Sequence, residues 1–205
     1  MLVCFGEKEG SMANKIAGQI NEIGRNIEDL ANYELRLKVM EGSEKIVSSS
    51  NPAKVAEWVR GAMDRLDALV DEPTRQQIML NCGYNCILVN SRPLDGARAR
   101  RRRFASEAAF LEAEIQKPPR GMRFERDGQL LIHYYTPQSY GSGMRCYCSL
   151  LRGLPPGQTA SATYCQCSRG FVQKYWEGIL GRPVQVELLE SAVSGAEECR
   201  FAVHL

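Results

Sequence analysis

Histidine is scarce in this chain of 205 residues: its 2 histidines, His133 and His204, both lie in apolar stretches. At each position we therefore expect a histidine that is hydrogen-bonded in the core or at a strand edge, rather than a metal ligand. Without a histidine beside a cysteine, a cysteine protease-like dyad is hard to assemble. A thiol nucleophile would need activation by a helix N-terminus or by a cation such as Arg145 or Arg169. The sequence assigns no catalytic residue.

Long apolar runs and a large net charge are also missing. No run approaches the ~18 residues that cross a bilayer, so no membrane anchor is expected. The start MLVCFGEKEG lacks the basic region and long apolar segment of a signal peptide, which predicts a cytoplasmic protein. The net charge of +2 predicts no general affinity for nucleic acid or membranes. The one charge run, Arg98 with residues 100–103, is typical of a solvated helix face offset by Glu107, Glu112 and Glu114.

Cysteine, by contrast, is plentiful, with 8 residues. In a reducing cytosol, clustered cysteines indicate metal binding or catalysis more than disulfides. Six of them form three closely spaced pairs: Cys82 with Cys86, Cys146 with Cys148, and Cys165 with Cys167. Residues four apart leave the same face of a helix, and residues two apart leave the same side of a strand. The spacing therefore predicts three elements that direct thiolates at one metal centre.

Zinc is the leading metal because four thiolates satisfy its tetrahedral preference without redox chemistry. Six sulfurs are too many for one such ion. Either two pairs bind one zinc with the third pair beside them, or six thiolates hold two bridged metals. An iron–sulfur cluster and copper(I) are the alternatives, and simple burial as small apolar residues is the non-functional interpretation. Cys4 and Cys199 are unpaired and are expected to be structural.

The residue pattern changes from helical to strand-like near Lys117. This divides a helical region, residues 1–117, from an α+β region, residues 118–205, and the two can form one compact unit. An apolar stripe from Ile16 to Leu30 predicts a first helix that packs within one subunit or in a homodimer. Asn51 with Pro52 begins a second helix. Pro73 opens a third, which carries Cys82 and Cys86, and a fourth is expected over residues 95–116.

After the prolines, the pattern changes to strands. Asp127 with Gly128 predicts a hairpin turn between residues 122–125 and 130–135. A helix follows over residues 168–180, ended by Gly181, and residues 184–188 and 199–203 alternate as two further strands. The expected fold class is α+β, with a helical N-terminal half packed on a C-terminal antiparallel sheet that has one long helix.

The last third carries a family resemblance. Its residues are Tyr164-Cys165-Gln166-Cys167-Ser168-Arg169-Gly170, Trp176, Gly181-Arg182-Pro183-Val184, Leu189-Glu190-Ser191, Gly195 and Cys199-Arg200-Phe201. Residues 120–205 thereby resemble vinyl-reductase-type small-molecule-binding domains and aminothiazoline-carboxylate-hydrolase-like proteins, a group of mostly uncharacterised bacterial proteins. The resemblance implies an α+β ligand-binding fold and, in the vinyl-reductase-type group, a cysteine metal site. It maps no family catalytic residue onto this chain.

Aromatic residues cluster around the cysteines. Most are expected to build the core, while Tyr147, Tyr164 and Trp176 are predicted to wall a ligand pocket beside the metal site. The predicted function is a cysteine-ligated metal-binding protein that binds or senses a small molecule. One alternative is a metal- or thiol-dependent hydrolase acting on a small heterocyclic substrate, which needs an open coordination position and a general base. The other is a structural zinc interaction module.

Overall fold

The computed structural model describes residues 9–47 and 49–205, so Cys4 lies outside the described part. Its helices are α1 (Glu9–Leu30), α2 (Tyr33–Val39), α3 (Pro52–Leu69), α4 (Glu72–Val89), α5 (Arg92–Arg101), α6 (Glu107–Gln116) and α7 (Gln166–Leu180). The strands β1 (Met122–Asp127), β2 (Leu130–Tyr135), β3 (Gln185–Glu190) and β4 (Cys199–His204) form one antiparallel sheet in the order β1-β2-β4-β3. The predicted α+β class is confirmed.

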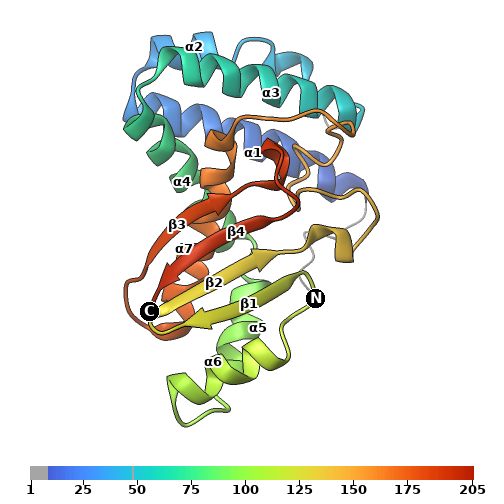
Figure 1. The fold of residues 1–205 in the computed structure, drawn as a ribbon. Helices are drawn as coiled ribbons and strands as arrows, with labels where there is room; N and C mark the ends of the chain where they lie inside the picture. Colours follow the sequence, from blue (N-terminus) through green and yellow to red (C-terminus); the bar gives the residue numbers. More distant parts are fainter. Residues whose placement is uncertain (1–8, 48) are drawn as a thin grey trace.

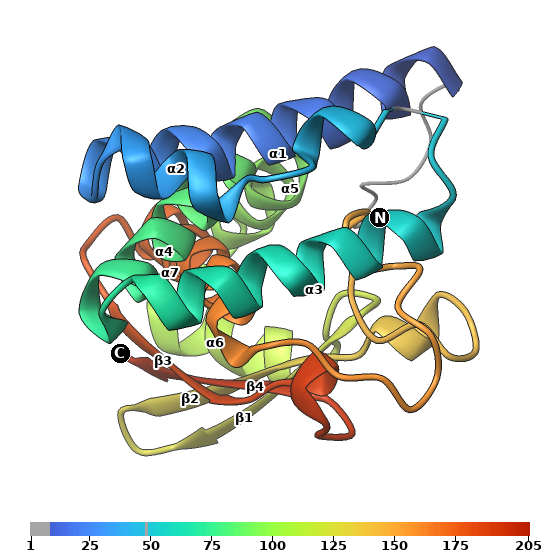
Figure 2. The same ribbon diagram turned by 90° about the horizontal axis from the view of Figure 1, so that it is seen from above.

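The elements form a sheet with helices gathered on one side of it (Figure 1). Helix α7 lies behind the sheet, α1 to α3 form a helical layer beyond one end, and α5 and α6 lie near the other end. Figure 2, the view from above, shows α4 and α7 running between the sheet and the outer helices. These two helices therefore join the helical half of the chain to the sheet.

Local sequence signals explain where the helices start. Asn51 caps α3, since its Oδ1 accepts from the Ala53 N–H at 2.8 Å, and Pro52 follows at the first helical position. Asp71 caps α4 in the same way, through the Thr74 N–H at 3.0 Å. The predicted starts of the second and third helices are thus confirmed.

The expected fourth helix is wrong as a single element. The structure divides it into α5 and α6, because Ser106 takes an extended conformation and its hydroxyl caps a new helix through the Ala109 N–H at 3.1 Å. The break lets Arg100 of α5 bind both carboxylate oxygens of Glu114 on α6, at 2.7 and 2.8 Å. One member of the arginine run therefore makes a structural ion pair.

Two hydrophobic cores hold the layers together. The first packs α1 to α4 against the segment 150–165, with Ile27, Val59 and Leu66 fully buried. The second packs α7, α5, α6 and the end of α4 against the sheet, around Trp176 and Phe201. Both cores contain residues from each side of Lys117. No helix in the described part of the chain is long and apolar enough to cross a membrane.

His133 occupies the centre of the second core, as expected for a core histidine. It is fully buried on β2, and its Nδ1 accepts a hydrogen bond from Trp176 Nε1 at 3.1 Å. Burial lowers the pKa of His133 to about 3. His204, by contrast, is exposed at the end of β4 with its Nε2 2.8 Å from Glu187. The fold therefore stores one neutral imidazole in an apolar site.

This burial predicts an acid-dependent loss of stability. The pKa of His133 is lower in the folded chain than the ordinary 6.5, so below pH 6.5 the unfolded state binds more protons and stability falls as the pH falls. Between pH 7 and pH 5 we expect His133 to contribute a loss of about 2 kcal/mol in the free energy of unfolding. Urea unfolding of the wild type and of His133→Gln over this range measures it. Identical pH slopes for the two proteins would contradict the prediction.

Candidate metal centre

The six paired cysteines lie on three segments, but only one pair has the expected local structure. Cys82 and Cys86 are one turn apart on α4, as predicted. The strand placement of the other two pairs is wrong. Residues 146–148 are an irregular loop, while Cys165 ends the 3-10 turn η3 (Ala162–Cys165) and Cys167 lies in the first turn of α7.

The cap at the start of η3 explains why Cys165 and Cys167 lie in helical turns and not on a strand. Ser161 caps it by accepting from the Thr163 N–H at 3.1 Å, and α7 continues from it at once. The loop that holds Cys146 and Cys148 is attached elsewhere: the Tyr147 hydroxyl donates to the Gly121 carbonyl at 2.6 Å. Both segments are therefore anchored without strand pairing.

Close packing of α4 on α7 brings two of the segments together. A Cβ added at Gly83 would lie 2.0 Å from the Cys167 carbonyl oxygen, and one at Gly170 would lie 2.2 Å from the Leu80 carbonyl oxygen. Such distances mean that the two helix backbones touch. Cys82 directly precedes Gly83, so the α4 pair lies beside Cys167.

Polar groups of the surrounding elements donate to several of the sulfurs. Asn26 of α1 donates from Nδ2 to Cys82 Sγ at 3.5 Å. The Tyr164 hydroxyl donates to Cys148 Sγ at 3.0 Å, and Gln19 Nε2 also reaches it at 3.7 Å. Hydrogen bonds to sulfur favour the thiolate, which is the form that binds metal. The sequence places Asn26 on the polar side of α1, so its role here was not foreseen.

Burial acts in the opposite direction on the thiols. Burial first, and then the Glu22 carboxylate, raise the pKa of Cys82 to about 12. Burial also raises the pKa of Cys167 well above its usual range, followed by charge interactions with Cys86, Cys82 and Cys148. These thiols are therefore neutral at pH 7 unless a metal displaces their protons. Their mutual interactions also place them in one neighbourhood.

Cys199 belongs to this neighbourhood, which sequence reasoning missed. Its sulfur accepts from the Ala192 N–H at 3.4 Å, and the adjacent Ser191 hydroxyl is 2.9 Å from Cys165 Sγ. The sequence correctly sets Cys199 in step with Phe201 on a buried strand face. Its approach to Cys165 depends on the path of residues 191–195 between β3 and β4, which no local pattern reveals.

The thiols do not form a preassembled coordination sphere. Within residues 9–47 and 49–205, no three cysteine, histidine, aspartate or glutamate side chains stand together as metal ligands would. Their donor chemistry nevertheless suits a soft metal, since thiolates bind zinc, copper(I) and iron–sulfur clusters. Metal binding would draw sulfurs of α4, the 146–148 loop and the start of α7 inward.

The aromatic residues assigned to a ligand pocket have other surroundings. Trp176 is fully buried and packs edge-on against Phe124 and Tyr175, each with a centroid distance of 5.5 Å. Tyr164 is buried over Cys148, and Tyr147 packs against Tyr135 at 5.2 Å. These contacts make the three rings part of the packing, and ligand binding by them stays a prediction.

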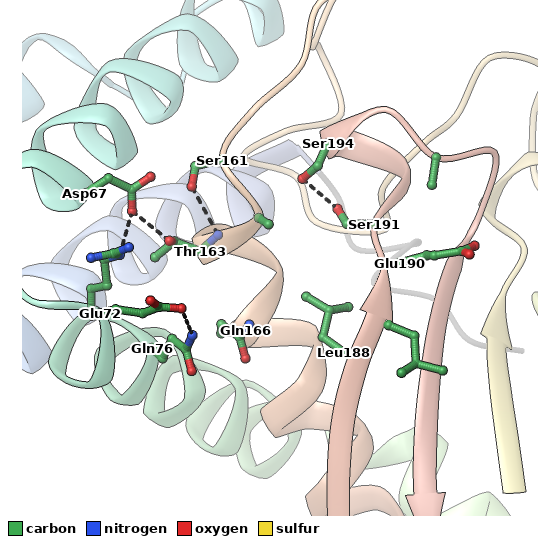
Figure 3. Close-up of a pocket in the computed structure, with 14 residues that line it drawn as sticks. Asp67, Glu72, Gln76, Ser161, Thr163, Gln166, Leu188, Glu190, Ser191 and Ser194 are labelled. Carbon is green, nitrogen blue, oxygen red and sulfur yellow. Dashed lines mark hydrogen bonds and ion pairs between the residues drawn. The ribbon is translucent and has the colours of Figure 1, made fainter.

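A polar cavity of about 530 Å³ lies between α3, α4, the start of α7 and the end of β3 (Figure 3). Asp67 at the end of α3 and Glu72, Arg75 and Gln76 at the start of α4 line one side. The starts of η3 and α7 contribute Ser161, Thr163 and Gln166 to the cavity wall. The sheet side contributes Leu188, Glu190, Ser191 and Ser194. The size of the cavity falls in the range of small-molecule sites. None of the three aromatic residues lines it.

Several groups in the cavity are already paired. Asp67 binds Arg75 Nε at 3.1 Å and accepts from the Thr163 hydroxyl at 2.6 Å. Gln166 is buried and accepts from Arg169 at 3.0 Å through its Oε1, which leaves its amide nitrogen as a donor for a ligand. Ser191 connects the cavity to Cys165. A molecule bound here would therefore lie one side chain away from the thiol cluster.

Arg145 and Arg169, the candidate thiol-activating cations, donate hydrogen bonds to other groups in this arrangement. Arg145 donates to the Pro155 carbonyl at 3.3 Å and to the Gln158 carbonyl, while Arg169 donates to Gln166. Burial raises the pKa of Cys165 to about 12. A cysteine nucleophile needs the opposite shift.

The fold is that of an α+β protein, with fully and partly buried cysteines where its helical layer meets its sheet. Residues 12–205 match the family described as "Family of unknown function (DUF6144)", and the chain belongs to that family. A search of curated proteins finds no match.

Proposed function

We propose that this protein binds a soft metal ion, zinc before others, through cysteines of α4, the 146–148 loop and the start of α7. One observation carries the proposal: α4, the 146–148 loop and the start of α7 are far apart in sequence, yet their thiols lie near enough to raise one another's pKa, and α4 packs directly against α7 at Gly83. Burial raises the pKa of Cys82, Cys146, Cys165 and Cys167, and neighbouring thiols raise each further. A soft metal would displace the protons of such thiols and be coordinated by the resulting thiolates.

We place zinc first because it has no redox chemistry and is commonly held in closed sites between packed elements. Four thiolates give it a closed tetrahedral shell. Iron–sulfur clusters use the same ligands and are tuned by hydrogen bonds to sulfur, such as those from Asn26 and Tyr164. Copper(I) is also selected by thiolates. Elemental analysis of the purified protein therefore decides between zinc, iron and copper.

Zinc should stabilise chelator-treated, anaerobically reduced protein. At about a thousandfold excess over the dissociation constant, mass action supplies about 4 kcal/mol, which corresponds to a rise of roughly 8–16 °C in Tm. Magnesium at the same concentration is the control, since it prefers oxygen ligands and should leave Tm unchanged. No shift with zinc, or equal shifts with both ions, would count against a thiolate site.

The small-molecule part of the proposal is supported by the cavity beside Cys165 and by the resemblance of residues 120–205 to small-molecule-binding domains. A polar ligand would occupy the cavity with Gln166 as a donor and the Glu72 carboxylate as an acceptor. The hydrogen-bonded Ser191 would transmit its presence to Cys165. Such a protein would sense a ligand beside its metal centre.

A thermal-shift screen of small acids and heterocycles tests this role. A ligand at a hundredfold excess over its dissociation constant should stabilise by about 2.7 kcal/mol, or roughly 5–10 °C in Tm. Gln166→Leu should abolish the shift, whereas Gln173→Leu, the same change elsewhere on α7, should preserve it. A shift that survives Gln166→Leu would place the ligand outside the cavity.

A structural metal module is the second candidate, favoured by the tight packing of Trp176 and Tyr164. In that case the metal would only join α4 and α7, and the screen would return no ligand while zinc still raised Tm. The two experiments together therefore separate the candidates.

A further inference from the structure

Resting on the proposed binding of a small molecule, we infer that the cavity between α3, α4, α7 and β3 takes a small organic cation, an amine that also carries a carbonyl or hydroxyl oxygen. Three features of the cavity wall describe such a ligand. One carboxylate has no ion pair within the described part of the chain, the arginine of the wall is already engaged, and a buried amide nitrogen has no partner among the described residues.

Carboxylates dominate the charge of the cavity wall. It contains Asp67, Glu72 and Glu190, and its one cation among the described residues is Arg75. Asp67 lies 3.1 Å from Arg75 Nε. Glu190 pairs with Arg200 of the neighbouring strand at 3.0 Å. Glu72 accepts a hydrogen bond from a neutral side chain of its own helix at 2.8 Å, but it forms no ion pair with any described residue. The cavity therefore has one negative charge that a ligand can balance.

The arginine of the wall is poorly placed to receive an anionic ligand. Arg75 binds Asp67 through Nε and donates from Nη1 to the Val70 carbonyl at 3.1 Å. An anion would have to compete with Asp67, which the buried Thr163 also holds through a hydrogen bond of 2.6 Å. It would then share the cavity with the Glu72 carboxylate, and like charges repel. The charges of the wall thus favour amines over acids.

The buried amide of Gln166 describes the other end of the ligand. The residue is only 9% exposed, and its Oε1 accepts from Arg169 at 3.0 Å. Because a guanidinium only donates, this bond fixes which amide atom is the oxygen, and Nε2 has no partner within the described residues. Buried polar groups are nearly always hydrogen-bonded, and Figure 3 shows Gln166 between the start of α4 and β3. A carbonyl or hydroxyl oxygen of the ligand would satisfy Nε2.

Three probes with one carbon skeleton test the charge of the ligand. At about pH 6.5, below the ordinary pKa of about 7.7–8.0 for an α-amine, leucinamide is a cation, leucic acid amide is neutral and leucic acid is an anion. Their isobutyl group suits Leu188 and Leu189 on the sheet side of the cavity. Titration of the isotope-labelled full-length chain, followed by NMR, measures weak affinities and observes the Gln166 side-chain amide directly.

Leucinamide should bind about threefold to fivefold more tightly than the neutral amide, the range of an ion pair that stays open to solvent, and leucic acid should bind most weakly. Glu72→Gln should remove this preference, and Glu72→Lys, the second variant, should reverse the order of leucinamide and leucic acid. Glu34→Gln is the matched control, because Glu34 is also an exposed glutamate in the first turn of a helix, α2. It should keep the preference.

Leucic acid that binds as tightly as leucinamide, a preference that survives Glu72→Gln, or a chain that binds none of the three probes would overturn the inference. The proposed small-molecule role is decided separately by the thermal-shift screen. A hit from that screen that is lost in Gln166→Leu would support the role even if the hit is an acid, whereas a screen without any hit would refute it. The two failures are therefore distinguishable.

Discussion

Gly83→Ala should destabilise the protein by roughly 3 kcal/mol. The added methyl would lie 2.0 Å from the Cys167 carbonyl oxygen and 2.8 Å from the Phe171 nitrogen. Both are backbone atoms of α7, so relief requires the two helices to move apart. That movement would also separate Cys82 from Cys167. Equilibrium unfolding in urea gives the free energy, and zinc affinity should fall in parallel.

Gly18→Ala is the matched control for this substitution. Gly18 lies on α1 with nothing within 4 Å of the added carbon, so alanine there should stabilise by up to about 1 kcal/mol through helix propensity. The same chemical change is therefore expected to have opposite signs at two helical positions. A Gly83→Ala protein as stable as the Gly18→Ala protein would show that α4 and α7 do not touch.

Trp176→Ala should cost about 3–5 kcal/mol, in the range of large-to-small changes in a core. The indole is fully buried among Phe124 and Tyr175, and its N–H is the partner of the buried His133. Trp176→Phe keeps most of the ring volume and loses the hydrogen bond, so about 1–3 kcal/mol is expected. Urea unfolding of both variants measures the difference.

This pair of variants also decides what Trp176 does. If the ring belonged to an open ligand pocket, its truncation would weaken ligand binding with less than about 1 kcal/mol lost in stability, as for substitutions away from a core. A large loss of stability with unchanged ligand-induced shifts would identify it as a core residue. The structure favours the second outcome, because no exposed surface of the ring remains.

Sequence patterns predicted most of the elements because their signals are local. The Asn51 cap, the Gly181 end of α7 and the hairpin between β1 and β2 each depend on a few neighbouring residues. The break between α5 and α6 was missed because residues 95–116 keep helical composition throughout, and the one cap at Ser106 decides it.

The site was less predictable because it depends on contacts between distant segments. The spacing of Cys82 and Cys86 correctly predicted that both lie on the same face of a helix, α4. Cys165 and Cys167 are two positions apart, the spacing that shares one side of a strand, but the chain there turns into a helix, and the sulfurs diverge. The cavity could not be foreseen, since Asp67, Gln166 and Ser191 meet only through packing of α3, α7 and the sheet.

The metal content of anaerobically purified wild-type protein tests the proposed function most directly. Elemental analysis should find at least one zinc ion, or another soft metal, per chain, and chelation should increase the number of thiols that react with a titrant. Protein that carries no metal, takes up none from added zinc and shows the same reactive thiols with and without chelator would contradict a metal centre at these cysteines.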